Sequence, residues 1–299
     1  MESSRQSKYM RADQESDRLK RFVIMDLDFR LPVAPNTDGN WQIIIIRHGT
    51  RETVRSDAFL NYSYYGEPDG PHRVDYYFWL LRRGEQVIVV DTGYSAWEAA
   101  RRERVVLVDP LDALSVLGID PAAGHPVIVT HAHYDHIGNI GAFTNSKIAI
   151  SRSEWEFWTD AIAEKTQFAH FGDHEALAQL YKAKDQERLT LFEDGFSPAP
   201  GIELSVLGGH TPGQAIVTVS TTEGPVILAS DAVHFHEELE RDMLFQSMVN
   251  LPDSYRALDR LRHHPQDLIV SGHDAGELEK HSPMAGPLSN LAATIGRNS

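Results

Sequence analysis

Short apolar runs alternate with glycine- and proline-containing turns along most of the chain. Three early runs, "WQIIIIRHG" (41–49), "RVDYYFWLLRRG" (73–84) and "EQVIVVDTG" (85–93), are rich in β-branched and aromatic residues, which predicts strands. The second and third runs meet at Arg83-Gly84 and predict an antiparallel hairpin. Later runs of the same kind predict strands over 125–133, 146–154, 201–209, 213–221, 224–232 and 267–274.

Helical patterns interrupt this series of strands. Good helix formers fill 153–190, where Ser153 and Asp173 are the predicted N-caps. Pro252 and Asp253 open a predicted helix over 251–264. We therefore expect one α/β domain over 22–299 with a helical insertion at about 153–195, preceded by a polar lead-in over 1–21.

The composition limits the classes of partner. The 299 residues are 41% hydrophobic, which is sufficient for a large core, and the formal net charge of −15 argues against nucleic acid and anionic membranes as partners. No run reaches the roughly 20 apolar residues that span a bilayer. The N-terminal segment lacks the apolar centre of a secretory signal, so we expect a cytoplasmic protein. The chain has no cysteine, so any metal ion must be held by histidines and carboxylates.

The stretch "VTHAHYDHIGN" (129–139) concentrates side chains that bind metal ions. Further candidates follow apolar runs in "LGGHTPG", "LASDAV" and "VSGHDAG". Since the carboxyl ends of strands meet at one edge of an α/β fold, we expect one site there. The candidate ligands are His131, His133, Asp135, His136, His210, Asp231 and His273. One zinc ion takes about four ligands, so a set of this size predicts two ions.

These motifs resemble those of the metallo-β-lactamase superfamily. The H-x-H-x-D-H signature at 131–136, "GGHTPGQ", "ASDA", "SGHD" and an early "DTGY" at 91–94 occur in the family's order between about residues 40 and 275. The resemblance implies an α/β fold, a four-layer αββα sandwich, with two divalent metal ions. Zinc is the first choice, and manganese, iron or cobalt would also suit these ligands. The resemblance further implies a ligand set for each ion. One ion is held by His131, His133 and His210, the other by Asp135, His136 and His273, and Asp231 bridges the two ions.

Several branches of this superfamily are separated by single residue types. The absence of cysteine excludes the Cys-dependent β-lactamases, Asp231 argues against the other true β-lactamases, and His133 argues against the flavo-diiron branch. "YGEPDGPHRVDYYFWLLRRG" and "SDAVHFHEELERDM" resemble the N-acyl homoserine lactonase branch, which implies a quorum-quenching hydrolase of a small lactone, and a homodimer. Those lactonases carry a tyrosine three residues after the bridging aspartate, where this chain has His234. We expect His234 to donate a hydrogen bond to the substrate carbonyl and Asp135 to pass a proton to the leaving group.

Other functions stay open at this point. The substrate could be another lactone or a thioester, as in glyoxalase II, and the chain could be a non-catalytic module that keeps the fold. "IIIIRHGT" (43–50) also resembles a histidine phosphatase motif, but the metal motifs account for far more of the chain, so we expect a structural or pocket-lining role for His48.

Some expectations concern the surroundings of the site. We expect 236–243 to form a solvated face and the insertion to form one wall of an apolar pocket. His125, His170 and His174 are expected at the surface. The aromatic candidates for the pocket are Tyr64, Tyr65, Trp155, Trp158, Phe168, Phe171, Phe235 and Phe245.

Overall fold

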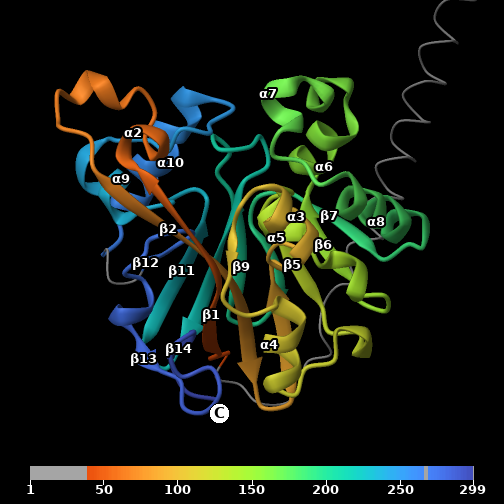
Figure 1. The fold of residues 1–299 in the computed structure, drawn as a ribbon. Helices are drawn as coiled ribbons and strands as arrows, with labels where there is room; N and C mark the ends of the chain where they lie inside the picture. The colour runs from red at the N-terminus through yellow and green to blue at the C-terminus, as the bar shows by residue number, and fades with distance from the viewer. Residues whose placement is uncertain (1–38, 266–268, 299) are drawn as a thin grey trace, which may run out of the picture.

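The computed structural model describes residues 39–265 and 269–298. The predicted lead-in over 1–21 and the predicted start of the domain at residue 22 lie outside the described residues. Two β-sheets pack face to face, and helices cover the outer face of each sheet (Figure 1). The four-layer αββα sandwich predicted from the sequence is confirmed.

The first sheet has the strand order β13-β14-β1-β2-β3-β5-β6-β7, and β4 also pairs with β1. Its first four strands in chain order are β1 (Gln42–Val54), β2 (Pro71–Arg83), β3 (Gln86–Val90) and β4 (Val105–Val106). The later ones are β5 (Val127–Val129), β6 (Ile148–Ser151), β7 (Leu189–Phe192), β13 (Ser282–Pro283) and β14 (Ala292–Ile295). The hairpin of β2 and β3 is confirmed, whereas β1 is longer than predicted and carries Arg51 toward the functional edge.

The second sheet has the strand order β12-β11-β10-β9-β8. Its members are β8 (Phe196–Ala199), β9 (Ile202–Val206), β10 (Ala215–Thr221), β11 (Gly224–Ser230) and β12 (Ile269–Ser271). The predicted strands over 201–209, 213–221, 224–232 and 267–274 correspond to β9 to β12. The parallel pairing of β11 with β12 places the ends of both strands at the same edge.

The helices lie in the connections between strands. The α-helices are α2 (Arg55–Ala58), α3 (Ala96–Arg101), α4 (Pro110–Val116), α5 (Tyr134–Ile137), α6 (Arg152–Thr159), α7 (Thr166–Ala169), α8 (His174–Asp185), α9 (His236–Arg241) and α10 (Leu251–Arg262). The 3₁₀ helices are η2 (Tyr62–Tyr65), η3 (Pro121–Ala123), η4 (Ile140–Ala142), η5 (Ala161–Glu164) and η7 (Leu278–Lys280). No described helix has the length and apolar content needed to cross a membrane.

The helix caps test the local predictions. Asp173 caps α8, as predicted, by accepting from the backbone N–H groups of Glu175 and Ala176. The cap predicted at Ser153 is wrong, because Ser151 accepts from the Glu154 N–H and starts α6 two residues earlier. Glu154, in the first turn of α6, is fully buried and contacts the functional site described below.

The core follows the alternation of side chains along the strands. In β1, Ile43 and Ile45 face the second sheet, whereas Ile44 and Ile46 face the helices on the other side. Both faces are buried, which explains why the run is continuously apolar. Leu239 of α9 and Leu258 of α10 close the outer face of the second sheet.

Two expectations about polar segments need correction. The stretch 236–243 is only partly a solvated face, since Glu240 and Arg241 are exposed whereas Glu238 and Met243 are fully buried. His125 is half-buried, whereas His170 and His174 are exposed as expected.

Candidate metal centre

Five of the candidate ligands lie in connections shortly after strand ends, and Asp135 and His136 lie in the short helix α5. His131 follows β5, and α5 begins immediately afterwards with His133 as its N-cap. Asp231 follows β11 directly, and His273 follows β12. Gly272 allows this approach, because a Cβ atom at that position would come within 2.7 Å of Asp231 Oδ1. The packing of the two sheets therefore brings together residues from four separate connections.

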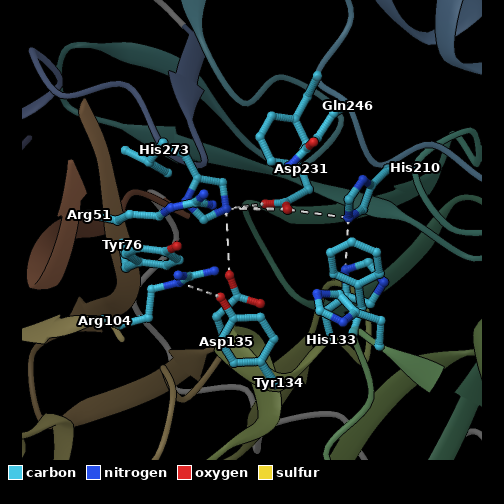
Figure 2. A pocket seen from close by; sticks show the side chains of 14 residues that line it. Arg51, Tyr76, Arg104, His133, Tyr134, Asp135, His210, Asp231, Gln246 and His273 are labelled. Atoms are coloured by element: carbon cyan, nitrogen blue, oxygen red, sulfur yellow. Dashed lines mark hydrogen bonds and ion pairs between the residues drawn. The ribbon is translucent and has the colours of Figure 1, made fainter. Parts of the chain in front are cut away.

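The structure arranges all seven predicted ligands in two adjoining buried groups. His131, His133, His210 and Asp231 form one group and Asp135, His136 and His273 form the other, with the ligand atoms of each group within 4.8 Å of one another. The division between the groups is the one that the sequence motifs implied for two ions. Figure 2 shows five of them around one cavity, namely His133, Asp135, His210, Asp231 and His273.

Asp231 lies between the two groups, and its carboxylate oxygens are close to imidazole nitrogens of both. Its Oδ1 is 3.3 Å from His136 Nε2 and 3.2 Å from His273 Nε2. Its Oδ2 is 3.3 Å from His210 Nε2 and 3.7 Å from His131 Nε2. A carboxylate that faces two sets of imidazole nitrogens in this way is suited to bridge two cations.

The donor atoms fit divalent metal ions. His131 Nε2, His136 Nε2 and Asp231 Oδ1 are buried and have no hydrogen-bond partner within residues 39–265 and 269–298. Buried polar atoms without a partner are costly in a folded protein, and a bound cation would satisfy all three. Imidazole and carboxylate donors suit zinc, and also manganese, iron and cobalt.

Hydrogen bonds orient the imidazole rings toward the centre. The Nδ1 atoms of His210 and His273 lie 2.7 Å from the backbone oxygens of Ser247 and Asp75. His136 Nδ1 lies 2.7 Å from Asp91 Oδ2, and the other oxygen of Asp91 accepts from the Thr130 N–H. When Nδ1–H is the donor, the lone pair of Nε2 is free to bind metal. Asp91, in the "DTGY" motif, therefore holds His136 without being a ligand itself.

The protonation states of three candidate ligands also favour metal binding. Burial lowers the pKa of His131 and His133 well below the usual value, and it lowers the pKa of His210 to about 3. All three rings are therefore neutral at pH 7, which is the form that binds a metal ion.

Glu154 connects two of the ligand-bearing loops. Its Oε1 accepts from the Ala132 N–H at 2.9 Å and from Trp158 Nε1 at 2.7 Å. Its Oε2 accepts from the Gly213 N–H at 3.0 Å. Burial raises the pKa of Glu154, although these donors act in the opposite direction. One carboxylate thus joins the loop of His131 and His133 to the loop of His210.

A cavity of about 180 Å³ opens onto five of the candidate ligands. Apart from His133, Asp135, His210, Asp231 and His273, it is lined by Arg51, Val74, Tyr76, Arg104, Tyr134, His170, Phe171, Phe245 and Gln246. Of the predicted aromatic candidates, Phe171 and Phe245 line it, whereas Tyr64 is 81% exposed. Phe171 and His170, from the predicted insertion, contribute part of one wall, so His170 has a place in the cavity that its sequence position did not indicate.

His234 does not line this cavity. Its ring is fully buried, stacks on Phe245 at 4.0 Å between centroids, and places Nε2 3.2 Å from Asp231 Oδ2. Burial opposes the charged form, but Asp231 and Glu238 outweigh it and raise the pKa of His234 to about 9. In this arrangement the ring of His234 faces Asp231.

His48 lies in the middle of β1, not after it, and is fully buried. Its ring packs against Tyr94 at 4.3 Å between centroids and does not reach the cavity. The phosphatase motif therefore lacks the exposed histidine that it requires. The structural role expected for His48 agrees with this position.

Tyr76, Arg51, Arg104 and Gln246 are cavity residues that sequence reasoning did not identify. None of them belongs to a metal motif, and no spacing in the sequence marks them. Burial raises the pKa of Tyr76 and of Tyr134, so both hydroxyl groups keep their protons at pH 7 and can donate hydrogen bonds.

Comparison with known proteins agrees with this geometry. The family model described as "Metallo-beta-lactamase superfamily" matches residues 74–273. An N-acyl homoserine lactonase from Bacillus sp. is 27% identical over 171 residues. The match covers 55% of this chain and only 61% of that relative's length.

Solved structures share the fold. A quorum-quenching N-acyl homoserine lactone lactonase matches with a TM-score of 0.64 and 22% identity, covering 78% of this chain and 92% of that chain. AidC, a dizinc quorum-quenching lactonase, matches with a TM-score of 0.60 and 19% identity, covering 86% of this chain and 94% of that chain. At these identities the likeness establishes the shared fold.

Proposed function

The chain belongs to the metallo-beta-lactamase superfamily, and from that premise we propose that it is a dinuclear metal-dependent hydrolase that opens a lactone ring. The observation that carries this proposal is Asp231, whose two oxygens face two separate groups of histidine ligands. N-acyl homoserine lactones are the first substrates to test, because a relative that matches more than half of the chain is named as their hydrolase.

The proposed ligands are those of the two buried groups. His131, His133 and His210 would hold one ion, Asp135, His136 and His273 the other, and Asp231 would contact both. Zinc is the proposed metal, since the solved relative AidC is described as dizinc and the donor set is compatible with it. When bound, two such ions supply Lewis acidity for the ester carbonyl and lower the pKa of water.

The chain's own residues would bind the substrate and move its protons. Asp135 lies on the cavity wall and is the proposed carrier of a proton to the leaving oxygen. The hydroxyl groups of Tyr76 and Tyr134 are the proposed donors to the substrate carbonyl. Phe171 and Phe245 would cover the apolar part of the substrate and exclude water.

For His234 we propose a positioning role, which replaces the carbonyl contact expected from the sequence. The ring nitrogen Nε2 lies 3.2 Å from Asp231 Oδ2, and the ring would fix the orientation of that carboxylate. The buried Glu238 lies 3.4 Å from the other ring nitrogen and would hold the imidazole in place.

The test combines metal analysis with a substrate panel. Zinc- or cobalt-loaded protein and a metal-stripped control are assayed for acid release from short and long N-acyl homoserine lactones, other γ- and δ-lactones and a glutathione thioester. We expect lactone opening that depends on about two ions per chain. Asp231→Ala should lose both metal and activity, whereas Asp259→Ala, at a side chain 68% exposed on α10, should keep both.

Several results would contradict the proposal. Retention of metal and activity by Asp231→Ala would refute the dinuclear centre, and hydrolysis of the thioester alone would replace the lactonase with a glyoxalase II-like enzyme. Two bound metal ions without any hydrolysis would favour the non-catalytic module. The homodimer and the cytoplasmic location remain predictions from the sequence.

A further inference from the structure

The cavity contains two arginines in an otherwise acidic protein. Arg51 and Arg104 are among its lining residues, although the formal net charge of the chain is −15. The carboxylates that line the cavity are Asp135 and Asp231. Both belong to the proposed metal ligands, so bound cations would neutralise them. With metal ions bound, the charged side chains of the cavity wall that are not neutralised are the two arginines, so this wall is positive.

Arg51 has no protein partner in the part of the chain that the structure describes. No hydrogen bond, ion pair or ring contact of its guanidinium is found there, although the side chain is half-buried. Neighbouring arginines differ, since Arg47 Nη1 lies 3.0 Å from Asp75 and Arg55 is paired with Glu237. Figure 2 shows Arg51 extending into the cavity beside Tyr76. A half-buried guanidinium with free donors is a ready partner for a carboxylate.

Arg104 lies on the same side of the cavity and is held in place. Its Nε donates to the Tyr134 hydroxyl at 3.2 Å, and its Nη1 donates to the Arg102 carbonyl at 2.6 Å. These bonds leave Nη2 without a partner among the described residues. Arg104 and Arg51 enter the cavity next to each other in Figure 2, with Tyr76 between them. Two cations on one wall favour a ligand whose negative charge is on that side.

The volume of the cavity limits the rest of the ligand. Pockets for drug-sized molecules usually measure about 300–1,000 Å³. This cavity measures about 180 Å³ before any metal ion is placed in it. A long acyl chain would have to extend outside it, whereas a small ring with one short substituent would fit.

We infer that Arg51, supported by Arg104, binds a carboxylate of the substrate, so that the preferred substrates are small lactones that carry a free carboxylate in addition to the scissile ester. The inference rests on the proposed lactonase function and narrows its substrate class. It ranks such anionic lactones above neutral N-acyl homoserine lactones. Arg51 is then a specificity-determining residue and takes no part in breaking the ester bond.

The experiment compares two lactones that differ only in charge. The metal-loaded full chain is assayed with 5-oxotetrahydrofuran-2-carboxylate, with its carboxamide and with N-hexanoyl homoserine lactone at 0.15 M salt. We expect kcat/KM for the carboxylate to exceed that for the carboxamide by at least about tenfold. In Arg51→Gln this ratio should fall about 10- to 100-fold, and in Arg51→Lys it should be intermediate, because a lysine keeps the charge but not the guanidinium fork.

The matched control is Arg256→Gln, which changes the net charge equally at a side chain that is 72% exposed and lies outside the cavity. It should keep the wild-type ratio. Equal kcat/KM values for the two lactones in the wild type, or an unchanged ratio in Arg51→Gln, would overturn the inference.

A binding measurement separates the failure of this inference from the failure of the proposed function. Tetrahydrofuran-2-carboxylate and its carboxamide, which cannot be hydrolysed as lactones, are titrated into the metal-loaded protein by ligand-observed NMR. If no lactone is opened, the proposed function fails. Tighter binding of the carboxylate in the wild type, lost in Arg51→Gln, would still support the anion site, and equal binding of the two probes would overturn it.

Discussion

Replacement of Glu154 by glutamine tests whether the metal loops depend on a carboxylate that is not itself a ligand. The wild-type side chain accepts three hydrogen bonds, from the Ala132 N–H, the Trp158 indole and the Gly213 N–H. Glutamine has nearly the same shape but only one oxygen. If that oxygen takes the place of Oε1, the new amide group faces the Gly213 N–H, and two donors oppose each other in the interior.

The expected effect follows from the loss of one acceptor. A buried donor left without a partner costs about 1–3 kcal/mol of folding stability. Ala132 lies between the ligands His131 and His133, and Gly213 follows His210 by three residues, so the freed loop carries ligands of the first group. Loss of a group that orients metal ligands typically lowers metal affinity about 10- to 100-fold. We expect Glu154→Gln to show both effects.

The assay measures metal affinity and stability separately. Metal-free protein is titrated with zinc against a chelator of known affinity, and urea unfolding of the metal-free protein gives the free energy of unfolding. Glu156→Gln is the matched control, because Glu156 is exposed on the same helix α6 and the substitution changes the charge equally. A zinc affinity of Glu154→Gln within about twofold of that of Glu156→Gln would refute the positioning role.

Two further predictions concern other buried groups. Asp91→Asn should lower the metal affinity of the group formed by Asp135, His136 and His273 about 10- to 100-fold, because His136 loses a charged acceptor 2.7 Å from Nδ1. Metal analysis during dilution should show the bound metal falling from two ions per chain toward one. Retention of both ions would contradict this prediction. Burial lowers the pKa of His48 in the folded protein to about 3, whereas its ordinary value is 6.5. Between these two pH values His48 is protonated in the unfolded chain but stays neutral in the folded protein. The contribution of neutral His48 to the free energy of unfolding is therefore complete above pH 6.5 and is lost as the pH falls toward 3, by about 2 kcal/mol at pH 5. In His48→Met, the fall in the free energy of unfolding between pH 7 and pH 5 should be smaller than in the wild type by that amount. An equal fall in the two proteins would refute the role of His48 in this pH dependence.

Local patterns in the sequence predicted most of the strands and the ligand set. The run at 43–46 is apolar on both faces because it lies between two packed layers, and such burial is visible in the sequence as a continuous apolar stretch. The candidate ligands could be predicted because metal binding demands particular side chains, and strand ends bring such side chains to one edge. The strands β13 and β14 were missed, since both are short and depend on distant pairing: β14 pairs with β1, some 250 residues earlier in the chain, and β13 pairs only with β14.

The sequence by itself determined which residues can bind metal and which runs form the layers, because both depend on side-chain type and local periodicity. Tertiary structure alone decided which side chains meet across the cavity. Arg51 on β1 and Arg104 before β4 line one wall only because the long first strand and a distant loop pack together there. The approach of His234 to Asp231 and the link that Glu154 makes between two loops were also decided by tertiary structure. Contacts of this kind form when separate segments pack together, and no local sequence pattern connects those segments.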